Sequence, residues 1–157
     1  IDGSRSPGAS YPSEDAMRFR SLLCVGVGVF GACLFQAAVG AQAPTSVLAG
    51  VYTADQAKRG QAVYTENCAA CHGDDLKGSE AFPALTGNGF VGGWGTVGEV
   101  FEKVSMTMPA TAPGSLTPAQ GADVVAFILS KNRFPAGAAE LASKAESLKS
   151  IKIEPAK

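Results

Sequence analysis

The feature that most constrains this chain is a pair of cysteines followed directly by a histidine, Cys68-Ala69-Ala70-Cys71-His72. That histidine is the only one in the sequence. The C-x-x-C-H spacing is the attachment motif for c-type haem. Two thiols three positions apart at a helix end can form thioethers with the two vinyl groups of one porphyrin, and the adjacent imidazole then faces the iron. The motif therefore predicts a fold built around one covalent haem c, held by Cys68, Cys71 and His72.

Three other uses of the two cysteines fit the sequence less well. A thiol–disulfide redox pair usually belongs to a βαβ pattern, and no alternating strand pattern of useful length is present. A zinc site needs four ligands, or three and a water, which three donors so close in sequence can hardly place around one tetrahedral ion. A disulfide between Cys68 and Cys71 would close a short loop and stabilise little. A non-haem redox or binding module with bare cysteines would give a colourless protein.

The first third of the chain differs in character from the rest. Residues 1–16 are rich in Ser, Gly, Pro and acids, and we interpret them as lying upstream of the true start or as a disordered lead. From Met17 onward, a basic stretch is followed by a short apolar run, Leu22 to Phe35, and by small residues that fit the A-x-A cleavage pattern. This order is typical of a secretory signal peptide, predicted here over 17–43. The alternative is an uncleaved membrane anchor, which the short apolar run disfavours.

Export changes the cysteine count and leaves a predicted mature domain over 44–157. Cys24 and Cys33 would leave with the signal, so the mature domain keeps only the thiols of the C-x-x-C-H motif. The whole chain has 13 basic and 14 acidic residues, and its formal net charge is −1. A nucleic-acid binder usually shows a basic excess. We therefore expect no nucleic-acid partner, and no stable membrane insertion after the signal is cleaved.

Three segments of the mature domain carry start signals for helices: 53–68, 96 to about 105, and 117 to about 131. Each begins with a threonine followed three residues later by Gln or Glu, which is the capping-box pattern. The segment 73–95 reads as irregular, and a short helix is expected over 138–148. The class is therefore all-α, with three to five helices around the haem. Aromatic residues are only 8% of the chain, so the porphyrin supplies bulk that its core lacks.

The second axial ligand of the iron follows by elimination. No second histidine is present, and methionine is the common alternative. Met106 and Met108 are the candidates in the mature domain. Met108 precedes Pro109, so its backbone should be extended and its side chain can reach the iron opposite His72, whereas Met106 is expected to be packed in the last helical turn. If both methionines only fill the core, the sixth position is open, as in a haem-based enzyme or gas sensor.

Four stretches give the mature domain a resemblance to the class I c-type cytochromes: RGQAVYTENCAACHG, FPALTG, MPATAPGSLT and ADVVAFIL. It is similar to the small cytochromes, or cytochrome domains, that accompany pyrroloquinoline-quinone dehydrogenases in bacterial periplasms. The resemblance implies a small cytochrome c fold in which His72 is the proximal and Met108 the distal ligand of the iron. Pro83 would accept a hydrogen bond from the other ring nitrogen of His72, with ordinary turn use as its alternative.

The same resemblance implies contacts and a role. Gly60 and Tyr64 of the first helix would meet Phe127 of the last, and Trp94 would lie either at the haem edge near a propionate or in plain core packing. The protein would be a periplasmic mono-haem carrier of single electrons and not itself an enzyme. Its donor would be a dehydrogenase, with a quinoprotein as the candidate, and its acceptor a downstream cytochrome or oxidase. It could also be a subunit of a dehydrogenase complex.

Overall fold

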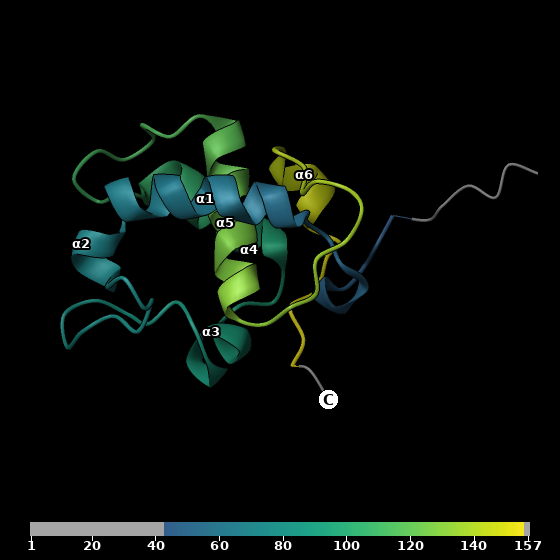
Figure 1. Cartoon of the computed structure of the whole chain (residues 1–157), viewed down its shortest axis with the longest axis horizontal. Coiled ribbons are helices and arrows are strands. Elements are labelled where there is room, and N and C mark those ends of the chain that lie inside the picture. Colours follow the sequence, from purple (N-terminus) through teal and green to yellow (C-terminus); the bar gives the residue numbers. More distant parts are fainter. Residues whose placement is uncertain (1–42, 156–157) are drawn as a thin grey trace, which may run out of the picture. The chain divides into compact units, whose positions relative to one another are not determined.

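The computed structural model describes residues 43–155, so the predictions for residues 1–16 and for the signal peptide up to residue 42 lie outside the described residues. Within this part no strand forms, and isolated bridges join Ser46 and Thr96 to Lys152. The all-α prediction is confirmed. The helices, shown in Figure 1, are η2 (Val47–Ala49, a 3-10 turn), α1 (Ala54–Asn67), α2 (Ala69–His72), α3 (Asn88–Gly93), α4 (Val97–Thr107), α5 (Pro118–Lys131) and α6 (Ala145–Leu148).

The three long helices begin where their threonine caps predict. Thr53, Thr96 and Thr117 each accept a hydrogen bond from the backbone N–H three residues later. This satisfies one of the donors that a helix start leaves without an intrahelical partner. In α4 and α5 the residue three positions on, a Glu and a Gln, also bonds back to the cap and completes the capping box. Local sequence therefore sets these helix starts.

The short elements differ from expectation. α3 forms inside the segment 73–95, which reads as irregular, and the tail has only the four residues of α6 where a helix was expected over 138–148. Helices this short are unstable alone and depend on tertiary packing. Phe90 of α3 and Leu148 of α6 are both buried. The short helices bring the α-helices in residues 43–155 to six, above the three to five expected.

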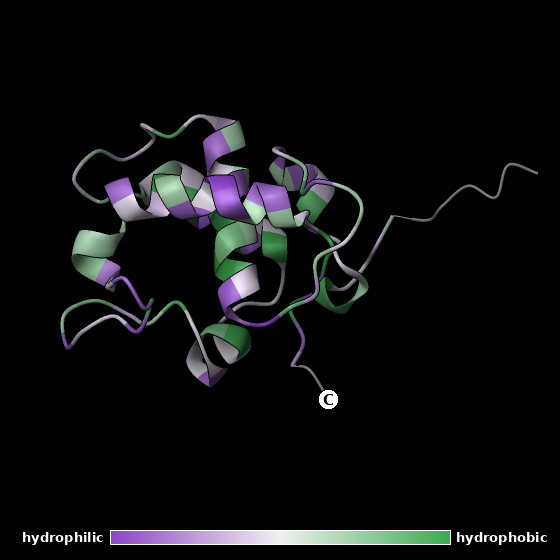
Figure 2. Ribbon diagram, in the orientation of Figure 1, coloured by the Kyte–Doolittle hydropathy of each residue, from purple (hydrophilic) through white to green (hydrophobic). Residues whose placement is uncertain are grey.

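The main packing contact is the crossing of α1 over α5 (Figure 1). Gly60 permits it, because a Cβ at this position would lie 1.8 Å from the carbonyl oxygen of Asp123. The Tyr64 and Phe127 rings meet beside it with centroids 5.2 Å apart. The predicted meeting of Gly60 and Tyr64 with Phe127 is confirmed. Figure 2 shows that the middle of α5 is apolar, as expected for a helix packed on several sides.

The C-terminal segment is tied back onto the start of α1. Gln56 is 2% exposed, and its side-chain amide both donates to the carbonyl of Leu141 and accepts from its N–H, at 3.0 and 2.7 Å. Gln56 therefore does not complete a capping box with Thr53, because its side chain is used by the tail. The Tyr52 hydroxyl donates to the carbonyl of Phe134 at 2.6 Å. None of the helices in residues 43–155 is long and apolar enough to cross a bilayer.

Candidate haem site

The attachment motif forms one helical turn directly after α1. Cys68 ends α1 and starts α2, and its carbonyl accepts hydrogen bonds from the N–H groups of Cys71 and His72 at 3.2 and 3.0 Å. This turn places the three residues of the motif next to one another in sequence and space, and Figure 1 shows it as α2 at the end of α1. Both cysteines are half-buried and neither is in a disulfide. The two sulfurs are thus free for covalent attachment.

The donor set suits a covalent porphyrin better than a bare metal ion. Among residues 43–155, no three His, Cys, Asp or Glu side chains are grouped so that they could hold a metal. A cysteine that binds zinc must also be deprotonated to a thiolate. Burial, with a smaller contribution from the neighbouring Cys71, raises the pKa of the Cys68 thiol to about 11. Two free thiols on one turn beside an imidazole fit thioether attachment of haem.

The His72 side chain is held in one orientation by a single contact. It is 9% exposed, and its Nδ1 lies 2.9 Å from the carbonyl oxygen of Pro83. A carbonyl only accepts, so Nδ1 carries the hydrogen and donates it. In the neutral imidazole the other nitrogen, Nε2, is then the one without a hydrogen, and it can bind a metal. Phe82 lies beside the imidazole in an edge-on arrangement, with ring centroids 6.3 Å apart.

A glycine that sequence reasoning did not single out brings Pro83 to this position. Gly78 has φ +68, and a Cβ there would lie 2.3 Å from the carbonyl oxygen of Phe82. Its N–H donates to the carbonyl of His72 at 2.9 Å. The loop therefore folds back on itself with its backbone touching at Gly78, and the Pro83 carbonyl comes within reach of His72. In the sequence, only the glycine six residues after His72 could have indicated that the loop folds back here.

A second unforeseen residue fixes the far end of the same loop. Asn132 follows α5, and its side-chain amide donates to the carbonyl of Leu85 while its oxygen accepts from the N–H of Gly87, at 2.9 and 3.0 Å. The amide also donates to the carbonyl of Ile128 at the end of α5. One side chain thus joins the end of α5 to the loop that carries Pro83. The polar residue at the end of an apolar helix was the only sequence signal.

The two candidate methionines lie in different environments. Met106 is in the last turn of α4, as expected, but it is 70% exposed instead of packed. The expectation of packing was wrong because α4 turns its apolar face, Val97, Val100, Phe101 and Val104, away from Met106. Met108 lies beyond the helix with extended backbone, φ −117 and ψ 150, and is half-buried. The extended backbone is the one that the following proline predicts.

Trp94 ends α3 and packs against the apolar core while staying half-buried. Within the described part of the chain its indole N–H has no hydrogen-bond partner. The structure thus shows Trp94 packed against the core, and its place near a haem propionate stays a prediction. The structure therefore brings Cys68, Cys71, His72 and Pro83 directly together, and it presents Met108 and Trp94 from separate segments.

Comparison with known proteins also points to a haem-binding cytochrome c domain. Residues 55–128 match the family model described as cytochrome c oxidase, cbb3-type, subunit III. A relative from Rubrivivax gelatinosus, a cbb3-type cytochrome c oxidase subunit CcoP, is 35% identical over 80 residues, which cover 48% of this chain and 26% of the relative. The chain thus spans about a quarter of that protein.

A solved structure, the sulfane dehydrogenase SoxCD from Paracoccus pantotrophus, aligns with a TM-score of 0.46 and 26% identity over 55% of this chain and 45% of the other. The family match carries more weight, because it extends from the first turn of α1 into α5 and includes the whole attachment motif. The helical fold and the free thiols beside the oriented imidazole agree with it. Together these findings support a class I c-type cytochrome domain, which implies a covalently bound haem c and haem-based electron transfer.

Proposed function

We propose that this protein is an exported mono-haem carrier of single electrons, with His72 and Met108 as the axial ligands of the iron. Cys68 and Cys71 would hold the cofactor through thioethers. When bound, the haem supplies a metal centre that takes up and releases one electron. The chain's part is to attach that centre, to orient its ligands and to shield it from water. The protein would not catalyse a reaction of its own.

The observation that carries the proposal is the hydrogen bond from His72 Nδ1 to the Pro83 carbonyl. It leaves Nε2 as the nitrogen that would bind the iron. An N–H bond to a carbonyl also increases the electron donation of the imidazole and holds its ring plane. A carrier benefits from this rigidity because its ligand geometry then changes little between the two oxidation states.

Met108 is the better distal candidate of the two methionines. Its extended backbone directs it away from the axis of α4, and its side chain is half-buried. Met106 remains on the helix with most of its side chain in water. A thioether ligand raises the potential of the iron relative to a second imidazole. The protein would therefore suit the downstream part of an electron-transfer chain.

The partners are redox proteins, and we propose a periplasmic dehydrogenase as donor, with a quinoprotein as the candidate. The acceptor would be a cytochrome or an oxidase, which agrees with the oxidase subunit named among the relatives. The formal net charge of the whole chain is −1, so long-range steering toward either partner would be weak. Export would be tested by the mass of the protein from a periplasmic fraction, which should begin near residue 44.

The experiment that tests the ligands is the visible and near-infrared spectrum of the holoprotein, with Met108→Ala beside the matched control Met106→Ala. We expect the ferric protein to show the weak methionine–iron charge-transfer band, and only Met108→Ala to abolish it. Wild type without this band that binds carbon monoxide at once would contradict the carrier and point to an enzyme or gas sensor. Loss of the band in Met106→Ala alone would assign the distal ligand to Met106 instead of Met108.

A further inference from the structure

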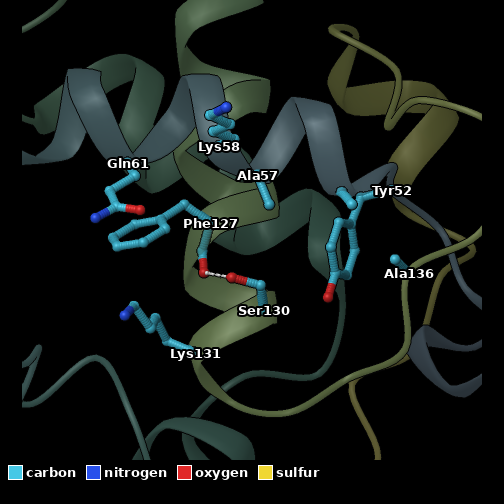
Figure 3. A pocket seen from close by; sticks show the side chains of 9 residues that line it. Tyr52, Ala57, Lys58, Gln61, Phe127, Ser130, Lys131 and Ala136 are labelled. Atoms are coloured by element: carbon cyan, nitrogen blue, oxygen red, sulfur yellow. Dashed lines mark hydrogen bonds between the residues drawn. The ribbon is translucent and has the colours of Figure 1, made fainter.

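A groove lies at the crossing of α1 and α5, and nothing in the haem site uses it. It has a volume of about 420 Å³. Its floor is aromatic, formed by the buried rings of Phe127 and Tyr52. Figure 3 shows the Phe127 ring between the side chains of Gln61 and Lys131. The remaining residues that line the groove are Ala54, Ala57, Lys58, Ser130 and Ala136.

The charged residues that line the groove are both basic. Lys58 of α1 and Lys131 of α5 lie on its rim, and none of its lining residues is acidic. Within residues 43–155 neither lysine has a carboxylate oxygen within 4 Å, whereas Arg59, next in sequence, is paired with both Asp123 and Glu140. The Lys131 ammonium instead lies 5.3 Å from the centre of the Phe127 ring. The groove thus combines an apolar floor with two positive charges that this part of the chain does not neutralise.

A short series of contacts connects the groove to the haem-attachment turn. Phe127, on the floor, packs against Tyr64 with ring centroids 5.2 Å apart. The Tyr64 hydroxyl donates to the carbonyl of Gly73, the residue after His72, at 2.7 Å. The side chains of Phe127 and Tyr64 would therefore connect a protein bound in the groove to the segment that carries the haem.

We propose that this groove docks a redox partner through an acidic segment that presents carboxylates on either side of an apolar side chain. The apolar side chain would lie on Phe127 and Tyr52, and the carboxylates would pair with Lys58 and Lys131. Desolvated apolar contact at the centre with charge pairs at the rim is the usual arrangement of a protein interface. The proposal rests on the proposed electron-carrier function, since it assigns the carrier a partner of stated chemistry.

The test is a ¹⁵N NMR titration of the reduced holoprotein with an acetylated tetrapeptide amide of alternating glutamate and leucine. We expect shifts concentrated on the amides of residues 57–61 and 127–131. The same peptide with glutamine for glutamate should bind roughly three- to tenfold more weakly, because each exposed ion pair contributes modestly. The double variant Lys58→Gln, Lys131→Gln should weaken binding of the acidic peptide by a similar factor. The variant Lys103→Gln, Lys152→Gln makes the same change in net charge away from the groove and should leave binding unchanged.

Four outcomes would overturn the docking site. They are shifts centred elsewhere, equal weakening by the control variant, equal binding of the glutamine peptide, and the same shifts with acetate at equal carboxylate concentration. Shifts that depend on protein concentration without peptide would assign the groove to a second copy and would also contradict the proposal. The charge-transfer spectrum tests the carrier function separately, so failure of the groove and failure of the carrier are distinguishable.

Discussion

The α1–α5 crossing and the loop from Gly73 to Gly87 are built in opposite ways. At the crossing, two long helices approach until the Gly60 backbone meets the carbonyl of Asp123, and the chain's own aromatic rings fill the space beside it. In the loop most residues are exposed, and a few hydrogen bonds define the path of the backbone. The crossing therefore contributes most to stability, whereas the loop contributes the position of one carbonyl oxygen beside His72.

Glycine shows the difference most clearly. Gly60 is required by a close approach of two helices, and Gly78 by a close approach within one loop together with a positive φ. Gly89 in α3 and Gly114 after α4 have no atom within 4 Å of the position of a Cβ. A glycine thus allows two helices to pack at Gly60, positions the loop beside His72 at Gly78, and does neither at Gly89 and Gly114. Alanine substitutions can separate these cases.

The largest effect is expected from Gly60→Ala. Its methyl group would overlap the Asp123 carbonyl, and α1 cannot yield without losing the Tyr64–Phe127 contact. We expect a loss of unfolding free energy of about 3 kcal/mol or more, at the upper end of overpacking effects. Chemical denaturation of the holoprotein measures it. The matched control Gly89→Ala, in an open helical position, should be neutral or slightly stabilising. Equal effects in both variants would contradict the dominance of the crossing.

Gly78→Ala should affect the site more than the stability. The methyl group would overlap the Phe82 carbonyl at a strained φ, so the loop must shift and the Pro83 carbonyl must move from His72. We expect a loss of about 2 kcal/mol, and a higher reduction potential because the imidazole donates less to ferric iron. Potentiometry and denaturation measure the two effects. Gly114→Ala has a similar φ without the overlap and separates strain from displacement. An unchanged potential in Gly78→Ala would contradict the positioning role of the loop.

Asn132→Ala tests the connection between the two regions. It removes the donor to Leu85 and the acceptor from Gly87, and it leaves those backbone groups to water. We expect a loss of about 1–2 kcal/mol. Amide hydrogen exchange should increase at Leu85 and Gly87 but not at Gly60. The exposed Asn88→Ala serves as the control. An increase throughout α1 would mean that the loop and the crossing open as one unit.

Tyr64 predicts a pH dependence. Burial, with Cys68, Asp74 and Asp75 nearby, raises the pKa of Tyr64 to about 12, from an ordinary value near 10. The fold favours the protonated phenol, so this contribution to stability is complete below pH 10 and is lost as pH rises from about 10 to about 12. Tyr64→Phe should cost about 1 kcal/mol at neutral pH through its lost hydrogen bond to Gly73. It should also flatten the stability profile between pH 10 and 12.

Tyr52 provides the comparison for this pH profile. Burial also raises the pKa of Tyr52, and its hydroxyl donates to Phe134 in the tail. Denaturation at several pH values measures both tyrosines. If Tyr52→Phe flattened the alkaline profile while Tyr64→Phe left it unchanged, the alkaline sensitivity would belong to the tail instead of the α1–α5 crossing.

The smallest effect is expected at the surface of the crossing. Arg59 donates to Asp123 and Glu140 from a side chain that is 49% exposed, and exposed ion pairs contribute little because solvent screens them. Arg59→Gln should lower the thermal midpoint only slightly, and the difference from wild type should vanish in high salt. A large, salt-independent loss would show that the network supports the crossing directly.

Local signals in the sequence determine the chemistry and the long helices of this protein. The C-x-x-C-H motif specifies the cofactor, three threonine caps set the starts of α1, α4 and α5, and Pro109 makes Met108 extended. Each of these effects acts within about four residues, so the sequence alone reveals it. The meeting of Gly60 with the last helix was expected from the resemblance to the class I c-type cytochromes, and it fits the rule that a glycine inside a helix is costly unless another helix needs the space.

Only the tertiary structure decided how distant segments meet. It diverts the Gln56 side chain from its own helix cap to the tail, exposes Met106, and lets Gly78 and Asn132 hold the loop that presents Pro83 to His72. It also joins Lys58 and Lys131, far apart in sequence, in one groove. These features depend on which surfaces pack together. A side chain's local sequence does not specify that choice, because the free energy that settles it comes from burial and hydrogen bonds shared across the whole domain.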